Sequence, residues 1–325
     1  NAVELKCYFH RAKLGTGDEL AAWRGAEQLW VYGKSRPKEC DPLFQAWLKA
    51  GQLNDEVVWA RMLKAFDSRQ RSLLAYVARQ GSAELQPWSD ILLSVYNQPD
   101  RLRNQKFPAS GKYSTDIATH GLAYLSRYSP ERALEQWQRL GSKLEFDPEQ
   151  VQQIEEAIAL RSLFAETEAN IPWLQGVLGT LGQDKLVELR LRWALSEKDW
   201  KAVESTLPLL SEAKAQESVW RHWQAIIDKR HGAAYSYVSA MEALAQERGY
   251  YSFLAAERLG RDYAFNNKPL HLAPDALAPL LILPAVLRVR ELVFHEEDRL
   301  AHAEWFKMLE ISDPNQLEQL GSLAS

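Results

Sequence analysis

The chain has 325 residues, of which 46% are hydrophobic, 10% aromatic and 25% charged. This composition can bury a core and excludes an intrinsically disordered chain. The 39 Lys and Arg against 43 Asp and Glu give a formal net charge of -4, and no block of basic residues is present, which argues against a nucleic-acid partner.

No segment predicts a membrane span. The longest apolar run, Ala276–Val289, is interrupted by Pro279, Pro284 and Arg288, whereas a helix that crosses a bilayer needs about 20 mostly apolar residues. The chain begins with neither an initiator methionine nor the hydrophobic stretch of a signal peptide, so we expect an interior or mature start.

Two cysteines, Cys7 and Cys40, lie near the start of the chain, and neither belongs to a Cys-x-x-Cys metal-binding pair. Their spacing leaves two interpretations open. They are either buried free thiols in a cytosolic protein or one disulfide in an exported protein.

Apolar residues recur at helical spacing along nearly the whole chain, and no run of alternating β-branched residues predicts a strand. The spacing predicts helices over residues 56–66 and 71–79. Two more helices are expected to begin at Ser129-Pro130-Glu131 and Asp147-Pro148-Glu149, where an N-cap residue precedes a proline. Short breaks between such segments indicate a succession of antiparallel helix pairs.

Helix pairs that cannot bury their own apolar faces are typical of an α-solenoid. The segment Gly121–Ala133 is similar to a tetratricopeptide hairpin and Leu191–Val203 is a looser version, but no strict repeat period holds. The sequence therefore predicts an all-α fold, a right-handed α-superhelix made of degenerate tetratricopeptide-like hairpins.

The composition changes after Phe265, where Asn266-Asn267-Lys268-Pro269 interrupts the helical pattern. New helices are predicted over residues 284–300 and 301–310. We interpret this part as the beginning of a second, small helical module.

No residue pattern indicates a metal, cofactor or catalytic site. His295-Glu296-Glu297 begins like a zinc-protease helix, but His302 lies seven residues after His295, whereas two ligands on one helical face need a spacing of four. A metallohydrolase using His295 and His302 is therefore a minor alternative, which zinc analysis would test. Paired carboxylates such as Glu155-Glu156 are interpreted as solubilising charges, and no nucleophile elbow or phosphate-binding loop is present.

Aromatic residues are abundant, with 12 Trp and 12 Tyr. Trp220 and Trp223 share one helical face, and Tyr250, Tyr251 and Phe253 precede small residues that permit close helix approach. We interpret both groups as packing between hairpins rather than as platforms for stacking sugars.

Several segments, in order along residues 1 to about 310, resemble the soluble lytic transglycosylases of the Gram-negative periplasm. Those similar to the superhelical domain of this family are Cys7–Lys13, Ala22–Trp30, Gly33–Ser35, Cys40–Phe44, Val219–Ala225 and Arg248–Gly260. Those similar to the start of its linker domain are Leu287–Leu292 and Ala303–Trp305.

The resemblance implies that Cys7 and Cys40 form a disulfide and that the protein is periplasmic, an oxidising compartment. It also implies an activity for the parent enzyme. Members of the family cleave the MurNAc-GlcNAc bond of peptidoglycan without water, through one glutamate in a Glu-Ser motif followed by Gly-Leu-Met-Gln, and leave 1,6-anhydro ends.

This chain contains Glu-Ser pairs at Glu217-Ser218 and Glu204-Ser205, but neither is followed by Gly-Leu-Met-Gln. We interpret Glu217 as a chance match, and we predict no catalytic residue, metal or cofactor. The resemblance then implies a superhelical (U-type) domain over residues 1–268, shortened at its N-terminus, and the beginning of a linker (L-type) domain over 269–325, with the catalytic domain absent.

The expected function is that of a non-catalytic scaffold of a lytic transglycosylase, inactive alone, in cell-wall turnover. Its expected partners are peptidoglycan glycan strands, the catalytic domain and other cell-wall enzymes. A tetratricopeptide-like protein-interaction scaffold without glycan binding is the alternative. Helical spacing does not indicate which polar faces meet a glycan, so no binding residue is predicted.

Overall fold

The computed structural model describes residues 2–108, 111–267 and 274–324. Within these ranges every regular element is a helix, which confirms the all-α prediction. No helix among them is long and apolar enough to cross a membrane. The chain divides into two compact units, Asn1–Ala234 and Tyr235–Ser325.

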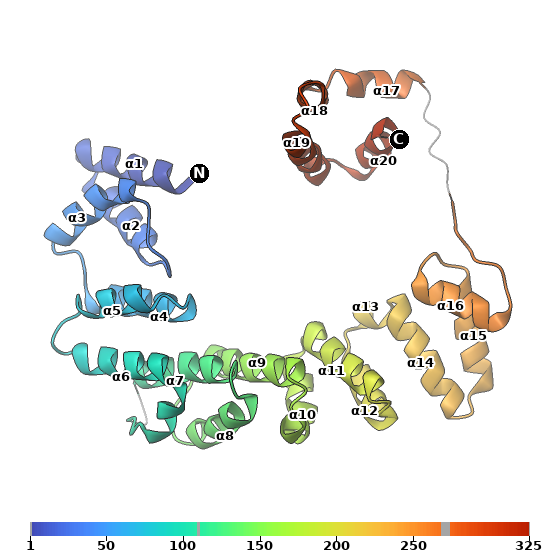
Figure 1. Ribbon diagram of the computed structural model, residues 1–325, viewed down its shortest axis with the longest axis horizontal. Helices are drawn as coiled ribbons and strands as arrows, with labels where there is room; N and C mark the ends of the chain where they lie inside the picture. The colour runs from blue at the N-terminus through green and yellow to red at the C-terminus, as the bar shows by residue number, and fades with distance from the viewer. Residues whose placement is uncertain (1, 109–110, 268–273, 325) are drawn as a thin grey trace. The chain divides into compact units, whose positions relative to one another are not determined.

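The first unit is a succession of short helices in which each packs mainly against its neighbours along the chain (Figure 1). Its α-helices are α1 (Ala2–Gly15), α2 (Glu19–Trp30), α3 (Asp41–Lys49), α4 (Asp55–Asp67), α5 (Arg71–Ala78), α6 (Gln86–Asn97), α7 (Lys112–Leu125), α8 (Pro130–Gly141), α9 (Pro148–Phe164), α10 (Ile171–Leu181), α11 (Asp184–Ser196), α12 (Trp200–Thr206), α13 (Glu212–Ala215) and α14 (Ser218–Arg230). Its 3-10 helices are η1 (Lys38–Cys40), η2 (Pro99–Asn104), η3 (Glu168–Asn170) and η4 (Leu207–Leu209).

The predicted helix starts at the two proline positions are confirmed. Asp147 caps α9 through a capping box in which its side chain accepts from Gln150 N and the Gln150 side chain accepts in return. Ser129 occupies the N-cap position of α8, but its side chain makes no capping hydrogen bond. The rigid ring of Pro130 is therefore the local feature that favours this start.

The sequence interpretation missed a structural repeat that relates α4–α5 to α11–α12. Helices α4 and α11 each have 13 residues and begin with an aspartate. Asp55 accepts hydrogen bonds from the backbone N (2.9 Å) and Oγ (2.5 Å) of Ser82, and Asp184 accepts the same pair from Ser211 at 2.7 and 2.6 Å. In both copies the serine follows the aspartate by 27 residues.

The loop between the two helices also matches in the two copies. Arg69 and Lys198 each lie two residues after the first helix and adopt left-handed backbone angles, with φ of 59° and 58°. Gln70 and Asp199 follow as the N-cap residues of α5 and α12. The repeat was hidden because its shared residues are few and widely spaced.

Among the described residues of the first unit, most buried apolar side chains belong to three clusters along the chain. The first extends from Cys7 to Ile158, the second from Ala159 to Trp193 and the third from Val187 to Ile227. This linear series of small cores is what stacking of helix pairs produces.

In the described part of the second unit, every regular secondary-structure element is a helix. The helices are α15 (Ala234–Ala245), α16 (Tyr250–Leu259), α17 (Pro274–Leu281), α18 (Pro284–Phe294), α19 (Asp298–Ile311) and α20 (Pro314–Ala324). Helix α18 begins at Pro284 as expected but ends before residue 300, because Glu296 adopts a left-handed conformation with φ of 58° and terminates the pattern. The boundary predicted between residues 268 and 269 lies outside the described residues and stays a prediction.

Candidate functional site

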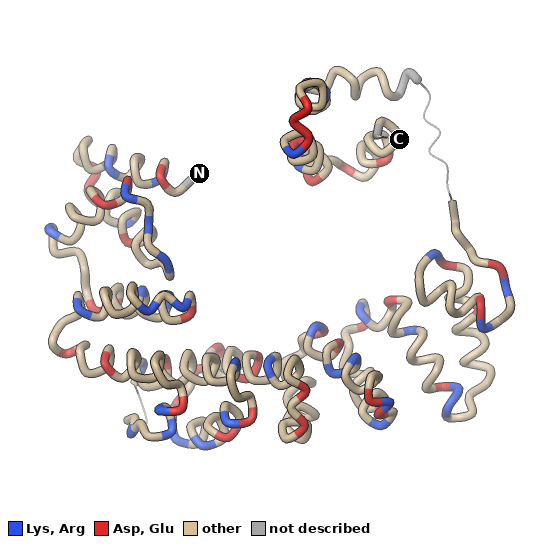
Figure 2. Tube along the Cα trace, viewed as in Figure 1, with Lys and Arg blue, Asp and Glu red and all other residues tan. Residues whose placement is uncertain are grey.

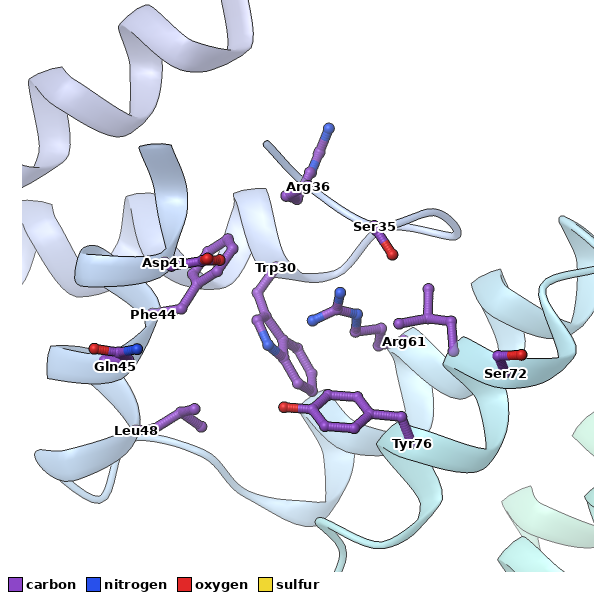
Figure 3. Close-up of a pocket in the computed structure, with 11 residues that line it drawn as sticks. Trp30, Ser35, Arg36, Asp41, Phe44, Gln45, Leu48, Arg61, Ser72 and Tyr76 are labelled. Carbon is purple, nitrogen blue, oxygen red and sulfur yellow. The ribbon is translucent and has the colours of Figure 1, made fainter. Parts of the chain in front are cut away.

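A pocket of about 510 Å³ lies in the first unit, among α2, α3, α4, α5 and the loop that follows α2 (Figure 3). It combines aromatic, apolar and polar side chains with two arginines. Its lining residues are Trp30, Ser35, Arg36, Asp41, Phe44, Gln45, Leu48, Arg61, Ser72, Leu73 and Tyr76.

Arg61 is the central charged residue of the pocket. It is the seventh residue of α4 and is only 5% exposed. Its guanidinium carbon lies 4.3 Å from the centre of the Trp30 ring, within cation–π range. Its Nε is buried without a hydrogen-bond partner, and Arg61 forms no ion pair with any residue in the described ranges. Buried polar groups are nearly always paired, so the unpaired Nε of Arg61 is an exception that calls for an explanation.

Burial lowers the pKa of Arg61 to about 10, and the nearby positive charge of Arg36 contributes in the same direction. This value is still well above neutral pH. Arg61 is therefore positively charged inside the protein, and no carboxylate of the described residues lies within ion-pair distance of it.

The mouth of the pocket is basic. The loop after α2 contains Lys34 and Arg36, Lys38 follows at the start of η1, and Figure 2 shows positive residues along this segment. Arg36 Nε donates to the Leu29 carbonyl at 2.6 Å, which orients its side chain, and burial lowers its pKa. Asp41 is the one acidic lining residue and is exposed to solvent.

Close packing of the loop at Gly33 shapes this mouth. A Cβ at position 33 would collide with Ser68 Oγ and with the backbone carbonyl of Lys64. Only glycine lets the loop lie this close to the end of α4. The Gly33-Lys34-Ser35 segment therefore places Ser35 and Arg36 next to the helix that carries Arg61.

A disulfide supports the opposite wall of the pocket. Cys7 in α1 and Cys40 at the end of η1 are bonded, with Cα atoms 4.9 Å apart, and both are fully buried. The structure thus contains the disulfide that the family resemblance implied. It anchors the start of α3, the helix that supplies Asp41 and Phe44 to the pocket.

A second polar aromatic surface lies on α6 and α7. Tyr96, Tyr124 and Tyr128 form a row with ring centres 5.7 and 5.1 Å apart, and Tyr128 Oη donates to Tyr124 Oη at 3.0 Å. The guanidinium of Arg69 lies 3.4 Å from the centre of the Tyr124 ring. Burial raises the pKa of Tyr124, whereas Tyr128 is 69% exposed. This tyrosine row was not recognised in the sequence because its members come from α6, from α7 and from the turn after α7.

Comparison with known proteins relates this architecture to one family. A family model described as the soluble lytic murein transglycosylase L domain matches residues 280–325. The soluble lytic murein transglycosylases of Salmonella typhimurium and Escherichia coli K12 are 28% and 26% identical over 325 residues, covering 99% of this chain and 50% of each relative. The chain is similar to the soluble lytic murein transglycosylases.

Solved structures of these transglycosylases share the fold. An inactive mutant of lytic transglycosylase Slt from Pseudomonas aeruginosa matches with a TM-score of 0.79 and 28% identity, over 99% of this chain and 52% of that chain. The 70 kDa enzyme Slt70 from E. coli matches with a TM-score of 0.80 and 26% identity, over 100% of this chain and 52% of that chain. The chain spans about half the length of these relatives and matches their non-catalytic region, which confirms the predicted superhelical class.

The Glu-Ser pairs of this transglycosylase relative lie outside the pocket. Glu217 is the N-cap residue of α14, and its half-exposed carboxylate accepts from Lys214 Nζ at 2.8 Å. Glu204 forms an ion pair with His231 at 3.1 Å. A general acid needs apolar surroundings. The Glu217 carboxylate is exposed and paired with Lys214, so it has no such surroundings.

The two histidines considered as metal ligands are placed on different elements. His295 caps α18 and contacts Glu291 at 3.4 Å, whereas His302 lies in α19 and lines an apolar groove. In the part of the chain that the structure describes, no group of three or more His, Cys, Asp or Glu could hold a metal ion.

The interpretation that aromatic residues pack between hairpins is confirmed for the group at Trp220 and is wrong in part for the group at Tyr250. Trp220 is 1% exposed, packs in the third cluster and donates its Nε1 to Glu188 at 3.2 Å. Tyr250 is instead 72% exposed at the first position of α16. Its helix buries Ala255 and Ala256, so the small residues, rather than this tyrosine, form the packed face.

Proposed function

We propose that this chain is the non-catalytic superhelical scaffold of a lytic transglycosylase that acts on peptidoglycan in cell-wall turnover. In this proposal the parent enzyme cleaves MurNAc-GlcNAc bonds without water and leaves 1,6-anhydro ends. The main support is the match of 99% of the chain to half of each transglycosylase relative, in their non-catalytic region. The TM-scores of 0.79 and 0.80 show that the shared sequence corresponds to a shared fold.

The scaffold alone is proposed to be inactive. The carboxylate of Glu217 is exposed and paired with Lys214, so it lacks the apolar surroundings that a general acid needs. Catalysis would then come from another part of the parent enzyme.

An apolar groove in the second unit is proposed to pack against that other part. The groove has a volume of about 800 Å³ and is lined by α18 and α19 residues such as Val289, Val293, Trp305 and Phe306. Phe306 is 63% exposed and Val293 55%. Exposed apolar patches of this kind mark interaction sites, and the relatives carry about as much chain again beyond the matched part.

The disulfide between Cys7 and Cys40 supports a periplasmic location, because structural disulfides persist in oxidising compartments. Peptidoglycan glycan strands are the proposed partner, and other cell-wall enzymes are further candidates. The tyrosine row offers a surface for a sugar ring at Tyr128, which is 69% exposed.

Sedimentation with insoluble peptidoglycan tests the proposal. The full chain is mixed with purified sacculi, and the pellet is assayed for bound protein while the supernatant is analysed by mass spectrometry. We expect bound protein and no 1,6-anhydro muropeptides. Release of anhydro products would show that the chain itself is catalytic, and failure to sediment would favour the protein-interaction scaffold.

A matched pair of variants localises the glycan contact. Tyr128→Ala removes the exposed end of the tyrosine row and is expected to weaken sedimentation. Tyr235→Ala, which removes a tyrosine that is 86% exposed in the second unit, serves as the control and should sediment like the unmodified chain. Equal binding of both variants would exclude the tyrosine row as the contact.

A further inference from the structure

The structural repeat provides an internal reference for the unpaired Arg61. Its counterpart Arg190 is likewise the seventh residue of a 13-residue helix, is 3% exposed and stacks on an indole, at 4.8 Å from the Trp193 ring centre. Arg190 Nη2 lies 3.9 Å from a carboxylate oxygen of Asp199.

The first copy of the repeat lacks this carboxylate. Asp199 is the N-cap residue of α12, and the N-cap residue at the equivalent place in α5 is Gln70. The Gln70 amide donates to the Ser68 carbonyl at 3.1 Å and so does not approach the arginine. The charge on Arg61 is therefore uncompensated where the charge on Arg190 is compensated.

We propose that the pocket around Arg61 binds a carboxylate, so that a ligand supplies the negative charge that Asp199 supplies in the second copy. The Arg61 guanidinium lies over the Trp30 ring, and its N–H groups make no hydrogen bond or ion pair with the described residues, although Nε itself is buried. A planar guanidinium edge matches the two oxygens of a carboxylate. Figure 3 shows the Arg61 guanidinium beside the Trp30 ring, among the other side chains that line the pocket.

The lining favours a singly charged carboxylate over a phosphate. Arg36 and Arg61 together oppose one acid, Asp41, so the site has one net positive charge. The two negative charges of a phosphate dianion would exceed the one net positive charge of the site. A neutral sugar would leave the charge of Arg61 without a partner.

The rest of the pocket suits the end of a short peptide. Phe44, Leu48 and Tyr76 offer apolar surface for small side chains, and Ser72 and Gln45 offer polar groups for peptide amides. A cavity of about 510 Å³ has the size of a small-molecule site. Peptidoglycan strands carry short peptides that end in free carboxylates. If the proposed function holds, the ligand is the carboxyl end of such a stem peptide.

Binding of a defined probe to the full chain tests the assignment. N-acetyl-D-Ala-D-Ala with a free carboxylate is titrated by calorimetry, and the same peptide with a C-terminal amide is the control. We expect the acid to bind and the amide to bind at least about tenfold more weakly, because the amide cannot form the charge-assisted pair. Equal binding of acid and amide, or tighter binding of inorganic phosphate, would overturn the proposal.

Two matched variants connect the binding to Arg61. Arg61→Met keeps an unbranched side chain over Trp30 and is expected to abolish binding of the acid, whereas Arg190→Met is expected to bind it unchanged. Circular dichroism confirms that both variants are folded. Undiminished binding by Arg61→Met would overturn the proposal, as would an equal loss in Arg190→Met.

The same reagents separate this proposal from the proposed function. Acid-specific binding that depends on Arg61, found in a chain that does not sediment with sacculi, supports the carboxylate pocket and overturns its stem-peptide source. Sedimentation with sacculi that Arg61→Met leaves unchanged, together with no binding of the acid probe, overturns the pocket and leaves the scaffold function supported.

Discussion

Arg61 and Arg190 occupy the same position in two copies of one helix pair, and only Arg190 has a carboxylate within ion-pair distance, that of Asp199 at 3.9 Å. Both arginines lie on an indole ring, at 4.3 and 4.8 Å. Because the backbone setting is shared, the missing carboxylate is a local difference between the copies rather than a property of the fold. The two positions therefore respond differently to the same substitution.

Replacing each arginine by methionine should affect the free energy of unfolding differently at the two positions. Arg61→Met removes a buried unpaired charge, so the free energy of unfolding is expected to stay unchanged or to rise by up to about 2 kcal/mol. Arg190→Met loses a cation–π contact and an ion pair to the half-exposed Asp199, and is expected to lower it by about 1 kcal/mol. Urea denaturation of both variants measures the difference. A larger loss in Arg61→Met would mean that Arg61 serves packing alone.

A methyl group at Gly33 should disturb the pocket mouth. The Cβ would collide with Ser68 and with the Lys64 carbonyl, so Gly33→Ala is expected to lower the free energy of unfolding by about 1–3 kcal/mol. Gly15→Ala, where a Cβ meets nothing within 4 Å, is the control and should cost nothing. Thermal unfolding of the two variants gives the comparison, and equal midpoints would show that the loop can move away freely.

Removal of the disulfide should loosen the first three helices. The bond joins residues 33 apart in sequence, and a loop of this size contributes about 2–4 kcal/mol. The double variant Cys7→Ala, Cys40→Ala is expected to be cut by protease within α1–α3 before other sites are cut. The unmodified chain should gain the same cleavage pattern on adding a reductant. Resistance of both samples to cleavage would contradict a stabilising role.

The Asp184–Ser211 contact should depend on pH. The Ser211 hydroxyl and backbone N–H hold the pKa of Asp184 below its ordinary value. Because the folded-state pKa is below the unfolded-state pKa, the stabilisation is present at neutral pH and is lost as the pH falls below about 4. Asp184→Asn should therefore be less stable than the unmodified chain at pH 7, and the difference should shrink in acid.

The control for this prediction is Glu197→Gln, an exposed residue at the other end of α11. This variant should follow the unmodified chain at every pH. A difference for Asp184→Asn that persists unchanged in acid would show that the carboxylate charge does not stabilise this contact.

Local signals made much of the fold predictable. Helical spacing, the Asp147 cap and the prolines at 130, 148 and 284 identify helix starts that the structure contains. Helix ends were less predictable, because α18 ends through the backbone conformation of Glu296 and not through a glycine or proline. The 27-residue Asp–Ser contacts that define the repeat join residues too distant for any periodic pattern.

The pocket could not be predicted from the sequence, for a physical reason. An arginine on an amphipathic helix is ordinarily solvated, and nothing in the sequence around Arg61 shows that Trp30 from another helix covers it. A comparison of α4–α5 with α11–α12 could have identified it. The N-cap residue of the following helix is Gln70 in the first copy and Asp199 in the second. Cys7 and Cys40 were assigned through the family resemblance, since their spacing alone allowed two interpretations.

The division of the first unit into three apolar clusters has a consequence for cooperativity. Each cluster contains buried tryptophan, for example Trp59 in the first, Trp193 in the second and Trp220 in the third. Structures stacked in a line can melt from one segment to the next, so a single midpoint does not describe them. Single-tryptophan reporters at these positions should lose their native fluorescence at different urea concentrations. The clusters would then unfold one after another rather than together.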